Sequence, residues 1–325
     1  MRHLRLLRIV TLAGLLGLPS AASAQDFELN VNTALTTDDP LYKGLEAFKA
    51  KVEERTAGQL AVRLFPGSQL GADEDVLEQA RAGANVAVVV DGGRLAEFVP
   101  EFAILGAPYL VDDFDQLRTL VTSDLFQSWA DKLAETSGHQ VLAFNWYQGD
   151  RHLLTNQPVS QPADLEGLRM RTPGAPAWLE TVRAMGATPT PMPWAEVYPA
   201  LQMGVIDAAE AQMPAVYGAR LYEVIDHITK THHIALITGI VTSRDWFASL
   251  PAEHQQIVKE EALAAGDLAS QGTIESIANY EKLMTEQGVT IAEIDTTPFE
   301  EASAVVYEKL GLQDLRQQVN QVLGR

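Results

Sequence analysis

Cysteine is absent from the 325-residue chain, and basic residues are scarce, with 24 lysines and arginines against 43 aspartates and glutamates. The lack of cysteine excludes disulfide bonds, thiol catalysis and metal sites with cysteine ligands. The acidic excess gives a net charge of -19, and such a surface repels phosphate backbones and anionic lipid headgroups. We therefore expect no nucleic-acid partner. An anionic small molecule would need arginines placed locally against the overall charge.

Long hydrophobic runs are absent beyond the N-terminus, since no later stretch approaches the roughly 18 apolar residues of a transmembrane helix. Three arginines in the first eight residues precede an apolar run over 9–18 and an Ala-Ser-Ala sequence that ends at Ala24. This pattern is typical of a secretory signal peptide, so we predict cleavage before Gln25 and a periplasmic protein that is not embedded in the membrane. A retained N-terminal anchor is the alternative. Without its signal, which has three basic and no acidic residues, the mature chain has a net charge of -22.

The motifs of common enzyme classes are also missing. The sequence has no G-x-S-x-G, no G-x-x-x-x-G-K-[ST], no H-E-x-x-H and no G-x-G-x-x-G after a predicted strand. His232 and His233 are adjacent, so in a strand they point to opposite faces, and neither has another histidine four residues away. We therefore predict no metal site, no cofactor and no enzymatic activity.

Hydrophobic periodicity predicts alternating strands and helices. Strands are expected over 27–33, 60–65 and 85–90, with helices between them, and the pattern recurs in a second unit that begins near residue 149. Such alternation is typical of an α/β fold with a mostly parallel sheet, in which ligands bind at the carboxyl ends of the strands. Extended flexible linkers are absent, so short crossovers are expected to join the two units as hinges.

A run of about 36 residues from 252 to 287 has no proline and predicts a helix some 50 Å long. A helix of that length is expected to span both units, with a possible kink at Gly266 or Gly272. A coiled-coil dimerisation arm is the alternative, although the apolar positions lack a sustained heptad. We expect a monomer, with dimerisation through a swapped C-terminal helix as the minority case.

Five segments, in the same order along the chain, resemble one known family. They are TAGQLAVRLFPGSQLGADEDVLEQARAG at 56–83, PEFAILGAPYLVDD at 100–113, GDRHLLTNQPV at 149–159, DLEGLRMRTPG at 164–174 and PMPWAEVYPALQMGVIDAAEAQMP at 191–214. The sequence is similar in these segments to the DctP-type solute-binding subunits of tripartite ATP-independent periplasmic (TRAP) transporters. The resemblance extends over essentially the whole mature chain.

The resemblance implies an α/β clamshell of two domains, bridged by a long helix, that closes over an organic acid without turnover. It also implies delivery of that acid to membrane permease subunits. Lobe I is predicted to comprise residues 25–148 plus about 237–276. Lobe II is predicted to comprise 149–236 plus about 277–325.

Two arginines are the principal ligand-binding candidates that the resemblance gives. Arg171, in LRMR before Thr172-Pro173-Gly174, matches the family arginine that clamps a carboxylate, and a guanidinium can form two parallel hydrogen bonds with that group. From the residues alone a surface salt bridge would be favoured. Arg151 matches a second family arginine, and a hinge-stabilising ion pair with Asp150 or a neighbour is its structural alternative.

Further ligand contacts are predicted from aromatic and polar residues. Trp194 lies at the start of a predicted helix and is expected to form an apolar wall beside the ligand, with simple packing at the helix start as the alternative. Trp146 and Tyr147 are candidates either for the cleft or for the core. Asp91 matches an acidic family position and can accept hydrogen bonds from ligand hydroxyls, although Asp91-Gly92-Gly93 alone would indicate a tight turn.

A supporting polar network is also predicted. Glu210 and His233 are expected to orient the guanidinium of Arg171 from behind. The sequence departs from the family at Ala211, where many members have asparagine, so Gln212 is expected to supply the amide contact or the contact is lost. This departure puts a sialic-acid type of pocket in doubt.

These features favour a sugar acid, such as a uronate or aldonate, ahead of a C4-dicarboxylate. A divalent cation bound together with the ligand is not excluded. A ligand sensor that docks on a membrane histidine kinase is the second hypothesis, and a secreted lyase or isomerase that acts on sugar acids is the third.

Overall fold

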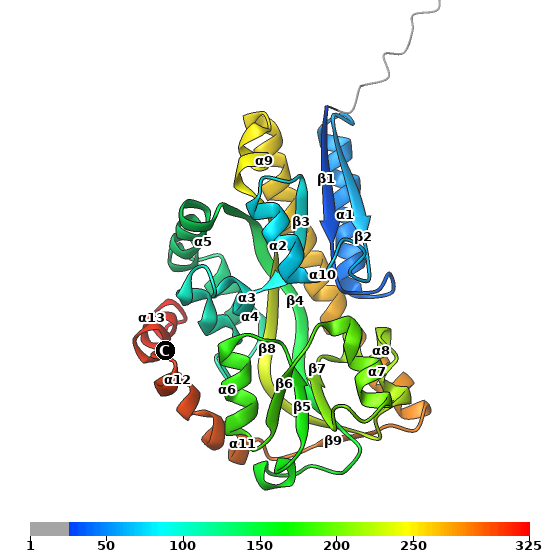
Figure 1. Ribbon diagram of the computed structural model, residues 1–325. Helices are drawn as coiled ribbons and strands as arrows, with labels where there is room; N and C mark the ends of the chain where they lie inside the picture. The colour runs from blue at the N-terminus through cyan, green and yellow to red at the C-terminus, as the bar shows by residue number, and fades with distance from the viewer. Residues whose placement is uncertain (1–25) are drawn as a thin grey trace, which may run out of the picture.

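The computed structural model describes residues 26–325, so the predicted signal peptide lies outside the described residues. Nine strands form one sheet in the order β2-β1-β3-β8-β4-β7-β5-β6, with β9 beside β8. Figure 1 shows two lobes, one built around β1–β3 and the other around β5–β7, joined by long strands that pass through both. The predicted two-lobed α/β fold is therefore confirmed.

Lobe I begins with the elements that the sequence pattern predicts. Val86–Asp91 is buried at every position, as expected for a strand covered on both faces. Asp39 caps the first helix, since its side chain accepts a hydrogen bond from the backbone N–H of Leu41, and Gly138 ends the last helix in the left-handed region. The elements are β1 (Phe27–Asn32), α1 (Pro40–Arg55), β2 (Leu60–Phe65), α2 (Asp73–Arg81), β3 (Val86–Asp91), α3 (Gly92–Leu95), η1 (Pro100–Gly106), α4 (Phe114–Val121) and α5 (Asp124–Ser137).

Two long strands, β4 (His139–Thr155) and β8 (His227–Ser243), pair with each other antiparallel and connect the lobes. Continuous strands therefore connect the lobes, and not the short crossovers predicted from the sequence. The sheet is also less parallel than expected, because β4 pairs antiparallel with β7 as well, and β3 with β8. The polar residues at 148–151 interrupt the apolar run, so the sequence pattern alone would end this strand near residue 146. These residues lie where the strand passes the space between the lobes.

Lobe II repeats the strand–helix alternation on a smaller scale. Its strand β5 pairs in parallel with both β6 and β7. The helix predicted from Trp194 is confirmed, with a first turn of 3-10 type. The elements are η2 (Pro162–Leu165), β5 (Arg169–Thr172), α6 (Pro176–Ala184), β6 (Thr188–Pro191), η3 (Trp194–Glu196), α7 (Val197–Gln202), β7 (Ala208–Ala211), α8 (Met213–Gly218) and η4 (Leu221–Glu223).

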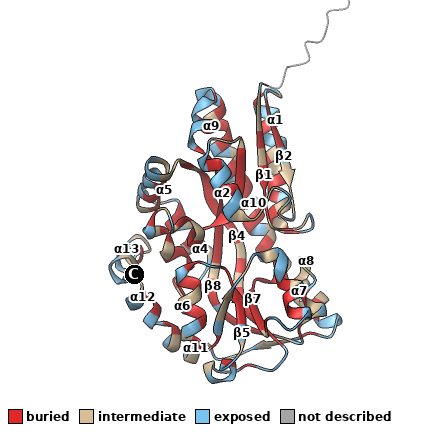
Figure 2. Ribbon diagram, in the orientation of Figure 1, coloured by how far each residue is buried: buried red, intermediate tan, exposed pale blue. Residues whose placement is uncertain are grey.

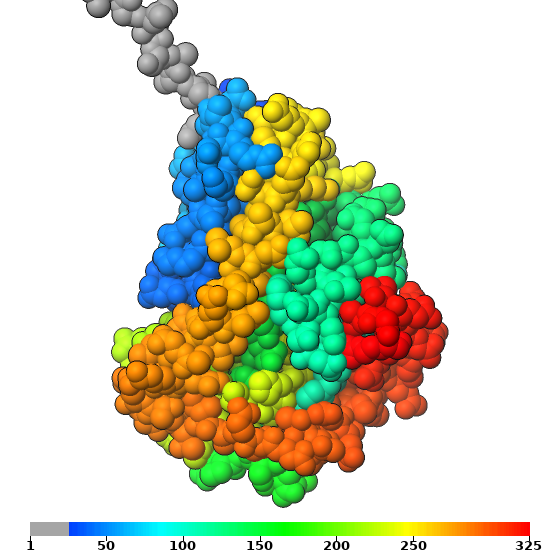
Figure 3. Space-filling view, turned by 180° about the vertical axis from the view of Figure 1, so that it is seen from behind, coloured from blue at the N-terminus to red at the C-terminus, as the bar shows by residue number. Residues whose placement is uncertain are grey.

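The long helix α10 (Ala252–Glu286) follows α9 (Arg244–Ser249) and confirms the predicted bridge. Figure 3 shows it running across the back of the molecule from one lobe to the other. It packs against α1 and β4 in lobe I and against α8 in lobe II. Small residues permit this close packing, since a Cβ added at Gly44 would lie 2.6 Å from the Cβ of Ala269.

The C-terminal segment consists of β9 (Thr290–Glu293), α11 (Thr297–Ser303), α12 (Val305–Lys309) and α13 (Gln313–Val322). Its last part differs from the predicted division, which placed all of 277–325 in lobe II. Tyr307, Leu312 and Val319 belong to the buried cluster of lobe I, and the Tyr307 hydroxyl donates to the Pro108 carbonyl at 2.7 Å. The apolar stripe of α13 is buried against lobe I, which explains the difference. The other predicted boundaries stay predictions.

Buried residues follow the sheet through both lobes, as Figure 2 shows. Within residues 26–325, no helix is both long enough and apolar enough to cross a membrane.

Two glycines of α10 provide a matched test of its packing. A Cβ at Gly266 would lie 2.8 Å from Trp146 Nε1 and against the Asn145 amide, whereas a Cβ at Gly272 meets only Pro40, at 3.6 Å. We expect Gly266→Ala to lower the free energy of unfolding by about 1–3 kcal/mol through overpacking. Gly272→Ala should leave it unchanged or raise it by up to about 1 kcal/mol through helix propensity. Urea unfolding measures both, and equal effects would contradict this packing.

Candidate ligand-binding site

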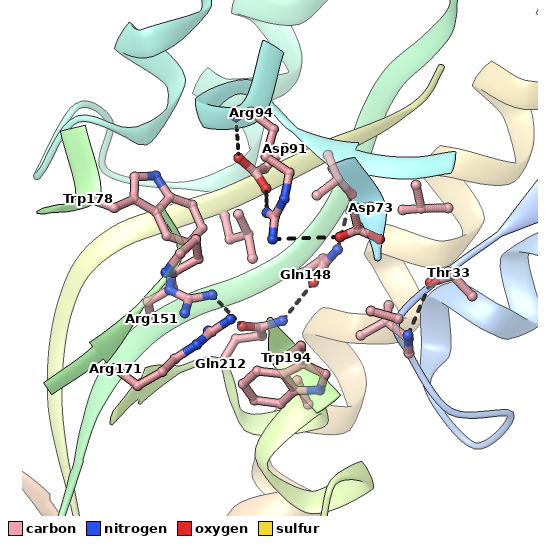
Figure 4. A pocket seen from close by; sticks show the side chains of 17 residues that line it. Thr33, Asp73, Asp91, Arg94, Gln148, Arg151, Arg171, Trp178, Trp194 and Gln212 are labelled. Carbon is pink, nitrogen blue, oxygen red and sulfur yellow. Dashed lines mark hydrogen bonds and ion pairs between the residues drawn. The ribbon is translucent and has the colours of Figure 1, made fainter. Parts of the chain in front are cut away.

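A cleft between the lobes brings together most of the predicted site residues. It encloses about 510 Å³, counting the part open to solvent. Figure 4 shows Arg151, Arg171, Gln212 and Trp194 on the lobe II side, and Asp91, Arg94 and Asp73 on the lobe I side. The full lining is Thr33, Ala34, Leu35, Asp73, Val89, Asp91, Arg94, Gln148, Arg151, Arg171, Pro173, Trp178, Trp194, Gln212, Ala215, Leu236 and Thr238.

Arg171, on β5, is only 2% exposed and has no carboxylate partner among the described residues. Its Nε and Nη2 donate to the Met192 carbonyl at 3.1 and 2.9 Å, and its guanidinium lies 5.3 Å from the ring centre of the half-buried Trp194. Burial, together with repulsion from Arg151, lowers the pKa of Arg171 to about 9. The side chain is still charged at neutral pH, so the cleft contains a buried positive charge without a counter-ion.

Arg151, on β4, is compensated by a carboxylate. It donates to both oxygens of Glu210, with the Nη2–Oε1 bond at 2.8 Å, and to Gln212 Oε1 at 3.0 Å. Its guanidinium also lies 4.5 Å from the ring centre of Trp178. Arg151 does not pair with the adjacent Asp150, and its carboxylate partner is Glu210. Arg151 therefore holds a fixed position, and most of its hydrogen-bond donors are occupied.

The sequence predicts that Glu210 and His233 orient Arg171, but in the structure Glu210 contacts Arg151 instead. Glu210 pairs with Arg151, not Arg171, and also accepts a hydrogen bond from Thr172 Oγ1 at 2.8 Å. His233 Nε2 lies 3.4 Å from Glu210 Oε2, and Thr231 Oγ1 lies 2.7 Å from His233 Nδ1. Strand β7 lies between β4 and β5, so the sequence could not decide which neighbour Glu210 would contact.

Electrostatics explain the charge states of this network. Burial would raise the pKa of Glu210, but attraction to Arg151 and the hydrogen bonds of its carboxylate outweigh burial and lower the pKa to about 2. Burial lowers the pKa of His233, despite its contact with Glu210. His233 lies beside the carboxylate, but its Nε2 makes no hydrogen bond to residues 26–325, so its positioning role stays a prediction.

The lobe I wall of the cleft contains one guanidinium among three carboxylates. Arg94 pairs with Asp91, with Glu74 at 2.6 Å and with Asp73 at 3.8 Å. Asp91 forms the predicted turn, since it caps α3 and accepts from the Arg94 backbone N–H at 3.1 Å. Burial raises the pKa of Asp73 to about 6, although Arg94 opposes the shift. At neutral pH this wall has an excess of negative charge.

Several cleft residues were not predicted. Arg94 follows Asp91-Gly92-Gly93, so the capping turn could have drawn attention to it, but Asp73 and Trp178 gave no local signal because each resembles an ordinary helix residue. Asp73 Oδ1 and Trp178 Nε1 are buried and have no hydrogen-bond partner among residues 26–325. Gln212 donates to Gln148 Oε1 at 2.7 Å and so links β4 to the start of α8. Trp178 Nε1 is packed against Gly106, where an added Cβ would lie 2.2 Å from it, so of the two atoms only the Asp73 oxygen is a candidate acceptor for a bound molecule.

The predicted cleft role of Trp146 and Tyr147 is wrong, and their core-packing alternative holds. Trp146 is fully buried and donates to the Ala262 carbonyl of α10 at 3.1 Å. Tyr147 packs against Phe114 and donates to Asp150 at 2.6 Å. Successive strand residues point to opposite faces, and here each face is covered by a helix.

Among residues 26–325 no group of three or more histidine, aspartate or glutamate side chains has an arrangement that could hold a metal ion.

Comparison with known proteins identifies the family. Residues 31–314 match DctP, described as bacterial extracellular solute-binding protein, family 7. The chain belongs to this family. The family resemblance predicted from the sequence motifs is therefore confirmed, and the protein is a solute-binding protein.

Individual relatives extend the comparison. A TRAP periplasmic solute-binding protein from Escherichia fergusonii, solved as an apo open structure, is 51% identical, with a TM-score of 0.81 and coverage of 91% of this chain and 99% of its own. One from Ochrobacterium anthropi, with bound L-fuconate, is 31% identical, with a TM-score of 0.89 and coverage of 92% and 99%. The 2,3-diketo-L-gulonate-binding periplasmic protein YiaO of Escherichia coli is 30% identical over 87% of this chain and 86% of its own.

The Arg151–Glu210 pair predicts a pH-dependent contribution to stability. Because the pKa of Glu210 falls from 4.5 to about 2 on folding, its contribution is complete above pH 4.5 and is lost as the pH falls towards 2. We expect Glu210→Gln to lower the free energy of unfolding by about 3 kcal/mol at pH 7, since it leaves Arg151 buried without a counter-charge. Urea unfolding from pH 7 to pH 2.5 should show this difference shrinking.

The control for this experiment is Glu223→Gln, which removes a carboxylate from a surface ion pair with Arg220. That variant should differ from the wild type by less than about 1 kcal/mol at pH 7. A Glu210→Gln difference that is small, or that is constant with pH, would show that the pair does not have the assigned strength.

Proposed function

We propose that this protein is the periplasmic solute-binding subunit of a TRAP transporter, which captures a sugar acid with one carboxylate and delivers it to membrane permease subunits. The observation that supports this most directly is the charge distribution of the cleft. Arg171 is a buried cation without a counter-ion, and it faces a polar wall with excess negative charge.

This distribution favours one carboxylate over two. A ligand carboxylate can pair with Arg171, whose Nη1 donates to no described residue. Glu210 compensates the charge of Arg151, and three carboxylates compensate that of Arg94. A second ligand carboxylate would therefore find no uncompensated cation among the residues that line the cleft. Its burial there would cost free energy. The sugar acid is therefore favoured ahead of a C4-dicarboxylate.

Hydroxyl groups fit the remaining contacts of the cleft. Asp73 Oδ1 can accept a hydrogen bond from a ligand hydroxyl. Trp194 offers an aromatic face beside Arg171. Relatives with sugar-acid names support this reading, since one was solved with L-fuconate and another is named for 2,3-diketo-L-gulonate.

A clamshell motion is the proposed binding mechanism. Residues that line the cleft come from both lobes, and β4 and β8 run between the lobes without interruption. The 51% identical relative, solved open and without ligand, has a lower TM-score than the 31% identical relative with ligand. Since identity alone would give the opposite order, this difference supports a lobe arrangement closer to that of the ligand-bound relative. We propose that ligand stabilises this closed arrangement.

The proposed activity is binding without turnover and without a resident metal or cofactor, by a monomer. No nucleophile–base pair was found among the cleft residues, and the relatives are named as transport proteins, which favours transport over the sensor hypothesis. Repeating every binding measurement with calcium and with a chelator tests whether a cation accompanies the ligand.

Removal of the uncompensated arginine should abolish binding. We expect Arg171→Ala to weaken sugar-acid binding by about 2–5 kcal/mol, because the ligand carboxylate would be buried without a counter-charge. Thermal unfolding with uronates, aldonates and C4-dicarboxylates measures this, since a ligand at about 100 times its Kd adds roughly 2.7 kcal/mol of stability. Monocarboxylate sugar acids should give larger shifts than dicarboxylates.

The matched control is Arg169→Ala, on the same strand. Arg169 is exposed and pairs with Asp207 outside the cleft, so its removal should leave ligand affinity unchanged. Equal loss of affinity in both variants, or retention of affinity in Arg171→Ala, would contradict the proposed clamp.

Small-angle scattering tests the motion. The mature protein should have a smaller radius of gyration with the stabilising sugar acid than without it, because the ligand contacts both lobes. Arg171→Ala should show no such compaction at the same ligand concentration. An unchanged radius for the wild type at saturation would contradict ligand-driven closure.

A further inference from the structure

A second cavity lies where α8 meets the start of α1, and it shares no residue with the ligand cleft. Figure 1 shows α8 beneath the lower end of α1, so the cavity lies at the junction of the two lobes. It encloses about 540 Å³, counting the part open to solvent. Its lining includes Asp38, Asp39, Tyr217, Arg220, Tyr222 and Tyr280.

Three tyrosine rings form one wall of this cavity. The ring centre of Tyr217 lies 5.4 Å from that of Tyr222, in a stacked arrangement, and 5.2 Å from that of Tyr280. The Tyr280 hydroxyl donates to the Asp38 carbonyl at 3.3 Å, which ties α10 to the loop before α1. The faces of tyrosine rings attract cations through their quadrupole.

A buried carboxylate faces the same cavity. Asp39 is 4% exposed, and one of its oxygens accepts a hydrogen bond from the Leu41 backbone N–H at 2.9 Å. No other hydrogen bond to this carboxylate comes from residues 26–325, and none of their cationic side chains forms an ion pair with it. A buried carboxylate without a counter-ion is unfavourable, and burial accordingly raises the pKa of Asp39 to about 7.

The other charged groups of the cavity do not compensate Asp39. Arg220 lines the cavity but forms an ion pair with Glu223, and its side chain is 66% exposed. Asp38 is exposed and adds a second negative charge. Lys43, in the first turns of α1, pairs with Glu46 instead. The cavity is thus aromatic, acidic and without a cation of its own at Asp39.

From this geometry we propose that the cavity binds a small organic ammonium ion, held by the Asp39 carboxylate and by the tyrosine rings. Aromatic faces with one buried carboxylate suit an ammonium group. A divalent metal ion prefers six or more oxygen ligands, which these residues do not supply. Because the walls come from both lobes, a bound ion would contact both. The proposal does not depend on the identity of the cleft ligand.

Titration calorimetry of the mature protein with choline tests the proposal, at pH 8 so that Asp39 is ionised. The neutral isostere 3,3-dimethylbutanol has the same shape without the charge. We expect choline to bind at millimolar concentrations, the isostere not to bind, and Asp39→Asn to weaken choline binding by roughly tenfold or more. Asparagine preserves the helix cap, so this variant should fold. Tyr217→Leu should also weaken binding and provides a second variant.

Two controls separate this site from the cleft and from general electrostatics. Arg171→Ala should bind choline as the wild type does, whatever its effect on sugar acids. Asp38→Asn, which removes an exposed carboxylate, should change choline affinity by less than Asp39→Asn. The proposal is overturned if the wild type does not bind choline, if the isostere or equimolar potassium competes equally well, or if Asp39→Asn binds unchanged.

Discussion

The antiparallel pairing of β4 with β8 is the constraint on which the rest of the molecule depends. Both strands are 17 residues long and pass through both lobes, so each lobe's sheet is built outward from the same pair. Two of the register shifts along this pair, between Tyr147 and Gly149 and between Arg151 and Leu153, lie beside the cleft residues Gln148 and Arg151. Irregular pairing of this kind bends a strand and re-aims its side chains. The same strands therefore join the lobes and place Gln148 and Arg151 in the site.

Packing on either side of this pair fixes what the strands present to the cleft. The helix α10 covers one face through Trp146 and the small residues around Gly266, and α4 covers the other face beside Tyr147. Because Trp146 and Tyr147 are both buried in the core, the polar residues Gln148 and Arg151 of β4 line the cleft at this point. The aromatic side chains of the cleft are instead Trp178 and Trp194 of lobe II.

The three arginines of the cleft differ in how far carboxylates compensate their charge. Buried ion pairs such as Arg151–Glu210 contribute little net stability when complete, but they strongly resist the loss of one partner. Such a pair keeps the Arg151 side of the cleft rigid. Arg171 lacks a carboxylate, so the free energy of pairing it is available to a ligand. Asp39 shows the opposite condition in the second cavity, where a buried anion lacks a cation. Both sites follow from one rule, that a buried charge requires a partner.

The sequence by itself determined the elements, the family and the residue types of the site. Periodicity located β1–β3, α1, α2 and α10 closely, because local hydrophobic patterns specify which face of each element is buried. The motif around Arg171 identified the clamp candidate by resemblance. The two lobes and the bridging helix also followed, since α10 is too long for one small domain.

Only the tertiary structure decided how these residues are partnered. The side chain of Glu210 could contact either neighbouring strand, and in the folded protein it forms an ion pair with Arg151 on β4. Trp146 and Tyr147 were equally suited to cleft or core until the helices covering β4 were placed. Asp73, Arg94 and Trp178 line the cleft because segments distant in sequence meet there. Similar long-range contacts pack α12 and α13 against lobe I. Local patterns determine secondary structure, whereas charge compensation and burial depend on long-range neighbours that no local pattern specifies.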